Sequence, residues 1–314
     1  MRVVFMGTPD FSVGSLKALA EAGHEIVAVV SQPDKPKGRG KNMQPTPVKA
    51  AALELGLPVY QPKKVRDPEF IQILKELKPD VIVVAAFGQI IPDQILELAP
   101  FGCINVHASL LPKYRGASPI QWAVIDGEKE SGVTIMQMDS GLDTGDMISK
   151  VIVPLDQDET GGSLFDKLSE AGAKLLVDTL PSIENGTAVR EKQPEESTTA
   201  YAGMIKKSLG NIEWKCRAEE LERLIRGLNP WPSAYTKLDG KTLKIWKAEV
   251  LDDDESKSYA EAGTILKADS HGFWVKTGKG ILNILELQLE GKKRMESAAF
   301  LRGYQVNEGR VLPF

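Results

Sequence analysis

Residues 81–112 read VIVVAAFGQIIPDQILELAPFGCINVHASLLP. Val81–Ala86 is a nearly continuous apolar run, which is typical of a strand buried on both faces of a parallel sheet. Residues 92–98 then predict a short helix, and residues 102–107 predict a second strand. A strand, a helix and a strand in this order indicate a parallel pair with the helix on a sheet face. This stretch therefore predicts a doubly wound α/β sheet.

The same alternation continues on both sides of this stretch. Strands are predicted at residues 2–6 and 26–30, and helices at residues 10–20, 48–55, 67–77 and 117–125. Residues 132–139 and 146–155 have the pattern of an antiparallel pair joined by a loop, and residues 163–180 predict a further helix. We therefore expect a mainly parallel sheet whose last strands are antiparallel.

The composition changes near residue 185. Residues 185–207 are polar and are typical of a linker. Beyond them, the pair Asp239-Gly240 is a strong hairpin turn signal. Further strands are predicted at residues 263–267, 272–276 and 281–287, and helices at residues 218–227 and 296–302. Several short strands with glycine turns indicate a small β-barrel. The predicted division is an α/β domain at 1–189, a linker at 190–207 and a barrel at 208–314.

The composition is that of an ordinary globular protein. The chain has 314 residues and 42% hydrophobic residues, with two cysteines and no CxxC pair. A disulfide framework and a structural zinc site are therefore not expected, and a reducing cytoplasm is the predicted location. The apolar run at 81–91 is too short to cross a bilayer, and the N-terminus begins as a strand and turn rather than as a secretory signal. Because no long apolar seam is present, we expect a monomer.

Asn105 and His107 lie two residues apart on the predicted strand at 102–107. Residues at this spacing share one face of a strand, and ligands of open α/β sheets bind beyond the strands' carboxyl ends. An amide supplies N–H donors and an imidazole a switchable donor or acceptor, so the pair suits a carbonyl oxygen that becomes an oxyanion. The alternative is a hydrogen-bonded structural pair at a strand end.

A second polar cluster, SGLDTGD, lies at residues 140–146. Asp143 could orient His107 and stabilise its charged form. The alternative is a turn held by Asx hydrogen bonds. Neither cluster pairs a nucleophilic serine or cysteine with a base, which favours direct transfer over a covalent intermediate.

The run KPKGRGK at residues 35–41 holds four cations in seven residues, with two glycines and a proline. This composition predicts a mobile basic loop that is neither a helix nor a stable strand. Because it follows a strand that ends near Val30, it should lie near the mouth of the same site and could seek phosphates. The alternative is an ordinary solvated loop.

Several of these motifs resemble those of the folate-dependent formyltransferases. The resemblance rests on NVHASLLP at 105–112, YRG at 114–116 and LDTG at 142–145. With FMGTPDF at 5–11, GRG at 38–40 and LNPWPSAYT at 228–236, it runs nearly end to end and points to the members that act on a tRNA. It implies a Rossmann-like catalytic domain followed by an OB-like barrel that binds tRNA.

The resemblance also implies a reaction. The co-substrate would be 10-formyltetrahydrofolate, with no metal, and the acceptor would be the free amino group of methionyl initiator tRNA. Direct attack through a tetrahedral intermediate would give formylmethionyl-tRNA for translation initiation. The implied catalytic residues are Asn105, His107 and Asp143. The implied folate-binding residues are Phe87, Gly88, Gln89, Ile90, Ile91, Ser109, Leu110, Leu111 and Pro112. In the basic loop, the expected tRNA-binding residues are Arg39, Lys35, Lys37 and Lys41.

Three alternative functions remain at this point. The same catalytic residues would serve a formyltransferase that acts on a small amine, such as glycinamide ribonucleotide or a nucleotide sugar. They would also serve a hydrolase in which water replaces the amine. A non-catalytic RNA-binding protein is a third possibility, which the intact set of Asn105, His107 and Asp143 disfavours. The separate barrel and the KPKGRGK loop favour the large acceptor, since a small substrate needs neither.

Overall fold

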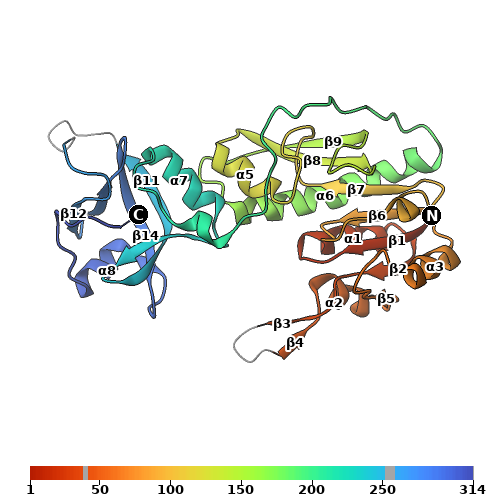
Figure 1. Cartoon of the computed structure of the whole chain (residues 1–314), viewed down its shortest axis with the longest axis horizontal. Coiled ribbons are helices and arrows are strands. Elements are labelled where there is room, and N and C mark those ends of the chain that lie inside the picture. The colour runs from red at the N-terminus through yellow and green to blue at the C-terminus, as the bar shows by residue number, and fades with distance from the viewer. Residues whose placement is uncertain (38–41, 252–258, 314) are drawn as a thin grey trace. The chain divides into compact units, whose positions relative to one another are not determined.

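The computed structural model describes residues 1–37, 42–251 and 259–313. The chain divides into two compact units (Figure 1). The N-terminal unit comprises residues 1–119, 130–154 and 165–202, and the C-terminal unit comprises residues 120–129, 155–164 and 203–314. The last boundary, between Ala202 and Gly203, falls inside the segment that the sequence predicts as a linker.

A seven-stranded sheet forms the centre of the N-terminal unit, in the order β5-β2-β1-β6-β7-β8-β9. The strands are β1 (Arg2–Gly7), β2 (Glu25–Val30), β5 (Val59–Tyr60), β6 (Val81–Ala85), β7 (Cys103–His107), β8 (Glu130–Gln137) and β9 (Met147–Pro154). The first five strands in that order are parallel, whereas β8 is antiparallel to both β7 and β9. The predicted mainly parallel sheet with an antiparallel pair is confirmed.

The first helices of the chain begin and end at ordinary local signals. They are α1 (Phe11–Glu21), α2 (Pro47–Glu54), α3 (Pro68–Leu77), α4 (Asp93–Leu96), α5 (Pro119–Asp126) and α6 (Gly161–Glu184). Proline occupies the first turn of α2, where its missing N–H costs nothing, and the Thr46 side chain accepts the Lys49 N–H at 3.2 Å. Helix α3 ends at Lys78, which is left-handed with φ 47°.

The two central strands β6 and β7 are buried at every position. Val84 of β6 pairs with Asn105 of β7, and His107 at the end of β7 pairs with Thr134 of β8. The backbone of Asn105 is therefore paired with strands on both sides, and the backbone of His107 is paired with β8. This arrangement fixes where Asn105 and His107 emerge at the carboxyl edge of the sheet.

The basic segment is more ordered than the sequence predicts. Lys35–Lys37 forms β3, which pairs antiparallel with β4 (Asn42–Gln44) in a separate two-stranded sheet. Figure 1 shows the two strands extending away from the large sheet. The expectation that this run forms no strand is wrong for residues 35–37. A two-stranded ribbon has two free edges, so it can accommodate Pro36, which lacks an N–H.

The C-terminal unit is built around an antiparallel sheet in the order β10-β11-β14-β13-β12, with β15 beside β14. Its elements are η1 (Lys207–Gly210), α7 (Ala218–Gly227), β10 (Ala234–Leu238), β11 (Lys241–Leu251), β12 (Ile265–Asp269), β13 (Gly272–Lys276), β14 (Ile281–Leu289), β15 (Met295–Glu296) and α8 (Ser297–Gly303). Asp239 and Gly240 join β10 to β11 and both have positive φ, 51° and 74°, as a type I′ hairpin turn requires. The sequence predicts a small β-barrel here; the predicted second, β-rich domain is confirmed, and its strands form an antiparallel sheet.

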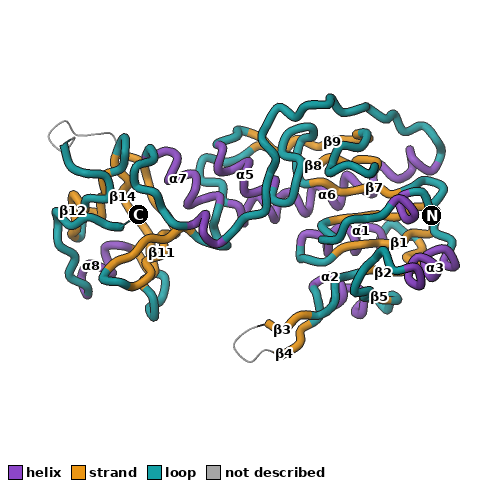
Figure 2. Tube along the Cα trace, in the orientation of Figure 1, coloured by secondary structure: helices purple, strands orange, loops and turns teal. Residues whose placement is uncertain are grey.

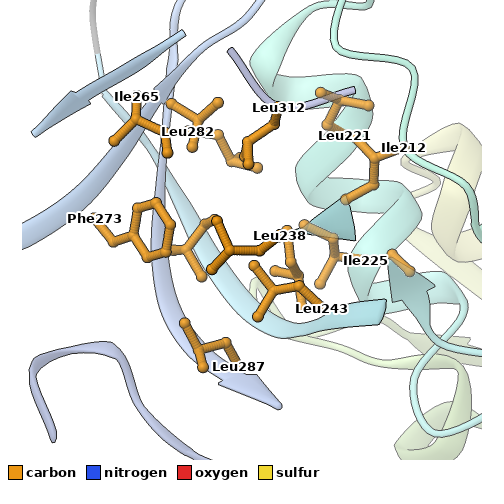
Figure 3. Packing of buried hydrophobic residues seen from close by; sticks show 14 of the residues in the cluster. Ile212, Leu221, Ile225, Leu238, Leu243, Ile265, Phe273, Leu282, Leu287 and Leu312 are labelled. Atoms are coloured by element: carbon orange, nitrogen blue, oxygen red, sulfur yellow. The ribbon is translucent and has the colours of Figure 1, made fainter. Parts of the chain in front are cut away.

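One apolar cluster holds the C-terminal unit together (Figure 3). Its members come from both α7 and the sheet, and they include Ile212, Trp214, Leu221, Ile225, Leu238, Leu243, Ile265, Phe273, Leu282, Leu287 and Leu312. Phe273 is 0% exposed and faces this cluster from β13. Packing of this kind is sensitive to lost volume, because neighbours fill a cavity only in part.

We expect Phe273→Ala to destabilise the C-terminal unit by about 3–5 kcal/mol, because it removes buried area and leaves a cavity. Urea unfolding followed by tryptophan fluorescence measures this directly, since all five tryptophans lie in the C-terminal unit. Val250→Ala is the matched control, because Val250 on β11 is 36% exposed. Equal unfolding midpoints for the two variants would contradict the assignment of Phe273 to the core.

Candidate active site

Two polar side chains project from the carboxyl end of β7. Asn105 is 8% exposed and His107 is 6% exposed. Their spacing of two residues puts them on one face of the strand. Within the described part of the chain, no protein group hydrogen-bonds to the Asn105 side-chain amide. Its N–H donors are therefore left for a ligand.

The ring of His107 lies between a carbonyl and a carboxylate. Its Nε2 is 3.1 Å from the Tyr114 carbonyl oxygen, and its Nδ1 is 3.6 Å from Asp143 Oδ1. Because a backbone carbonyl can only accept a hydrogen bond, Nε2 carries the proton. The neutral ring then presents a lone pair at Nδ1, and a second proton bound there would face the Asp143 carboxylate.

Asp143 lies in the loop between β8 and β9, with its backbone at φ 55°. Aspartate tolerates this left-handed conformation better than most residues. Its Oδ2 accepts the Gly116 N–H at 2.9 Å, which turns the carboxylate toward the His107 loop. Gly116 itself has φ 125°, and a Cβ there would stand 2.7 Å from the Ala202 carbonyl oxygen. Only glycine fits this position without displacing its neighbours.

The loop after β7 is held by residues far along the chain. The Ser109 hydroxyl donates to the Lys113 carbonyl at 2.7 Å. The Ser197 hydroxyl donates to the Pro112 carbonyl at 2.6 Å, and the Tyr114 N–H donates to the Thr199 hydroxyl at 2.7 Å. Sequence patterns did not single out Ser197 and Thr199, which fall in the polar segment predicted as a linker.

Sequence comparisons decide the family. The family described as Formyl transferase matches residues 1–180, and the one described as Formyl transferase, C-terminal domain, matches residues 204–305. A methionyl-tRNA formyltransferase of Agathobacter rectalis is 59% identical to this chain over 309 residues, with 98% of each chain covered. The chain belongs to the formyl transferase family. The methionyl-tRNA formyltransferase of Lachnospira eligens is 55% identical over 314 residues, with 99% of each chain covered.

A solved structure shares the formyl transferase fold at low identity. HypX from Aquifex aeolicus, in complex with tetrahydrofolic acid, matches with a TM-score of 0.61 and 18% sequence identity. The match covers 96% of this chain and 47% of that one. At this identity the comparison supports only the fold of this chain. The family is shown by the sequence relatives.

The residues that family resemblance implies for folate differ in their exposure. Phe87 is 2% exposed, Leu111 1% and Ser109 0%, so these three residues present almost no surface to a ligand. Ile90 is 82% exposed and follows Gly88, whose φ is 85°. The remaining predicted folate residues are the buried Ile91 and the half-buried Gln89, Leu110 and Pro112.

The Gln89 side chain is already bonded within the protein. Its Oε1 accepts the Val65 N–H at 2.8 Å, and its Nε2 donates to the Lys63 carbonyl at 3.5 Å. These bonds tie the loop after β6 to the segment before α3. We therefore expect Gln89 to shape the wall of the site through its backbone rather than to contact a ligand with its side chain.

The predicted tRNA-binding residues are only partly described. Lys35 is exposed at the start of β3, and Lys37 lies at the end of that strand. Arg39 and Lys41 lie outside the described residues. The base of this hairpin is anchored by Lys49, whose Nζ donates to Asp34 Oδ2 at 2.6 Å and to Gln61 Oε1 at 2.7 Å.

The same anchor affects the titration of Asp34. The hydrogen bonds from Lys49 and then from Gln61 lower the pKa of the Asp34 carboxyl. Asp34 therefore stays ionised, and paired with Lys49, well into acidic solution.

Metal-ligating side chains do not cluster in the described part of the chain. Among residues 1–37, 42–251 and 259–313, no group of three or more His, Cys, Asp or Glu side chains could hold a metal ion. Both cysteines are free, and burial raises the pKa of the Cys103 thiol to about 12. At neutral pH Cys103 is therefore a protonated, apolar core residue rather than a nucleophile.

Proposed function

We propose that this chain transfers the formyl group of 10-formyltetrahydrofolate to the free amino group of methionyl initiator tRNA. Relatives named methionyl-tRNA formyltransferase, 59% and 55% identical along nearly the whole chain, support this function. The observation that carries the chemistry is the placement of the His107 ring, with Nδ1 3.6 Å from the Asp143 carboxylate. Asn105 on the same strand face supplies the second polar group.

In the proposed reaction, the neutral amine of the methionyl group attacks the formyl carbon. The Asn105 amide and the protonated His107 donate hydrogen bonds to the carbonyl oxygen as it becomes negative. Because Nε2–H is already donated to Tyr114, the donor available on His107 is Nδ1–H. A preorganised oxyanion donor is typically worth about 10²–10³ in rate.

Asp143 has two tasks in this mechanism. Its carboxylate lies 3.6 Å from His107 Nδ1, where it orients the ring and would accept a hydrogen bond from a proton bound there. It also accepts the proton that the attacking nitrogen loses and helps to move it to the departing folate nitrogen. General acid–base help of this kind contributes about 10²–10⁴ in rate.

A formyl-transfer assay tests the acceptor. We expect formyl transfer to methionine charged on initiator tRNA and little transfer to methionine charged on elongator tRNA. Formate release without any acceptor would indicate a hydrolase. Transfer to a small amine such as glycinamide ribonucleotide or an amino sugar nucleotide would favour the alternative, a formyltransferase that acts on a small acceptor.

We expect Arg39→Ala to weaken binding of initiator tRNA while leaving the affinity for folate unchanged, because the basic hairpin would contact phosphates and not folate. A lost phosphate contact should also make the plot of log K against log salt less steep by about 0.7–0.9. Titrations of labelled tRNA at several salt concentrations measure both quantities. The control is Lys75→Ala, because Lys75 is an exposed lysine on α3. If the wild-type affinity for tRNA did not change with salt, the proposal would be contradicted.

The location and assembly of the protein remain proposals. Among the described helices, none combines the length and apolarity that a bilayer crossing requires. We propose a cytoplasmic enzyme, because translation initiation supplies its acceptor there. We also propose that it acts as a monomer, which sedimentation or light scattering would test.

A further inference from the structure

A loop segment holds together the loop that follows His107 and the loop that carries Asp143. We call residues 191–202 the strap. Figure 2 shows it within the long loop (teal) that follows α6. At one end, Glu191 and Met147 exchange two backbone hydrogen bonds of 2.8 Å. At the other end, the Ala202 N–H donates to the Arg115 carbonyl at 2.8 Å. The strap therefore spans from the start of β9 to the loop after β7.

Gln193 connects the two loops from the middle of the strap. It is 5% exposed, and its Nε2 donates to the Asp143 carbonyl at 2.9 Å and to the Gly145 carbonyl at 2.7 Å. Its Oε1 accepts a hydrogen bond from Arg115 Nε at 3.0 Å. Carbonyls only accept and a guanidinium only donates, so these partners fix which way the amide points.

Arg115 extends this link back to the strap. Its side chain is buried, 8% exposed, and its two terminal nitrogens donate to the Pro194 carbonyl at 2.7 Å and the Glu195 carbonyl at 3.1 Å. The planar fork of a guanidinium can make these bonds and the bond to Gln193 at once, which a lysine could not. Arg115 is therefore a fixed cross-link between the His107 loop and the strap.

Asp143 is thus held from both sides. Gln193 holds its backbone carbonyl, and the N–H of Gly116, the neighbour of Arg115, holds its carboxylate at 2.9 Å. The separation of 3.6 Å between His107 Nδ1 and Asp143 Oδ1 depends on both attachments. Errors of about 1 Å in the placement of catalytic groups can cost about 10²-fold in rate.

We propose that Gln193 and Arg115 are positioning residues for formyl transfer, which set the place of the Asp143 carboxylate relative to His107. This inference rests on the proposed function. Neither residue needs to touch the substrate, because each acts through the loop that carries Asp143. The strap is then a working part of the site rather than a passive connection between domains.

The first test is Gln193→Ala in the full chain, assayed for formylation of methionyl initiator tRNA. We expect kcat to fall about 10- to 100-fold, with KM for both substrates within about 3-fold, because positioning and not binding is lost. The matched control is Lys192→Ala, an exposed neighbour on the same strap, which should keep wild-type kcat. Wild-type kcat in folded Gln193→Ala would overturn the inference.

Two further variants make the result specific. Gln193→Glu keeps the acceptor for Arg115 but loses both donors to the Asp143 loop, so it should lose kcat like the alanine variant. A melting curve checks that this variant is folded. In an Asp143→Asn background, Gln193→Ala should lower kcat by less than about 3-fold, because the group that it positions is already disabled. Full kcat in Gln193→Glu, or equal losses in both backgrounds, would refute positioning through Asp143.

The proposed function and this inference fail in different ways. A wild-type protein that transfers no formyl group to tRNA would contradict the function before any variant is compared. An active wild-type protein whose Gln193 variants match it would leave the function intact and remove only the inference.

Discussion

His107→Ala should lower kcat for formyl transfer by about 10²–10⁴-fold, the usual value of a positioned acid or base. The variant loses the Nδ1–H donor of His107. In the proposed reaction this donor lies beside Asp143 and donates to the oxygen of the tetrahedral intermediate. Folate affinity should change little, because the ring is 6% exposed and is held by protein groups rather than by a ligand surface. Single-turnover formylation with saturating tRNA, alongside a folate titration, separates the two effects.

The control for His107 is the exposed His271, whose side chain is 78% accessible and lies in the turn between β12 and β13. His271→Ala should keep the wild-type rate. Asn105→Ala should lose about 10²–10³-fold, as expected for one oxyanion donor. If His107→Ala turned over at a near-wild-type rate, the role assigned to the imidazole would be wrong.

Much of the fold follows from the sequence because its signals are local. The buried strand β6 is a continuous apolar run, and β7 ends in alternating residues that place Asn105 and His107 on one face. The helix predicted at 218–227 and the strand predicted at 272–276 have the same bounds in the structure. In each of these cases the pattern of nearby residues was sufficient to predict the helix or strand.

The strap could not be predicted in the same way. Gln193 bonds to carbonyls about fifty positions earlier in the chain, so no periodic pattern surrounds it. From sequence alone, a polar segment without helix or strand signals predicts a linker. Only the structure shows which residues it bonds to. In the sequence, Arg115 stands out only as part of the YRG motif at 114–116. Its burial, which requires acceptors from elsewhere in the chain, is seen only in the structure.

The hairpin of β3 and β4 was missed for a related reason. Its strands are three residues each, polar, and interrupted by Pro36, so propensity gives no strand signal. Their pairing depends on an anchor at the base, where Lys49 binds Asp34 and Gln61. In the predicted folate wall, Phe87 packs in a core cluster, and its contact with folate stays a prediction.

The Asp143 carboxylate should matter as much as His107, because it faces His107 Nδ1 and accepts the proton of the attacking amine. Asp143→Asn keeps the size of the side chain and an oxygen that can accept the Gly116 N–H, but it removes the negative charge 3.6 Å from His107 Nδ1. Without that charge, His107 Nδ1 loses the charged acceptor beside it, and the attacking amine loses its proton acceptor.

We therefore expect kcat to fall about 10²–10⁴-fold in Asp143→Asn, with KM for folate within about 3-fold. Asp139→Asn is the matched control, because the Asp139 carboxylate lies in the same loop but accepts from Gly141 N–H and the Thr144 hydroxyl, at 3.0 and 2.9 Å. That variant should keep the wild-type rate. Equal rates for the two variants would show that loop structure, and not the charge beside His107, governs the reaction.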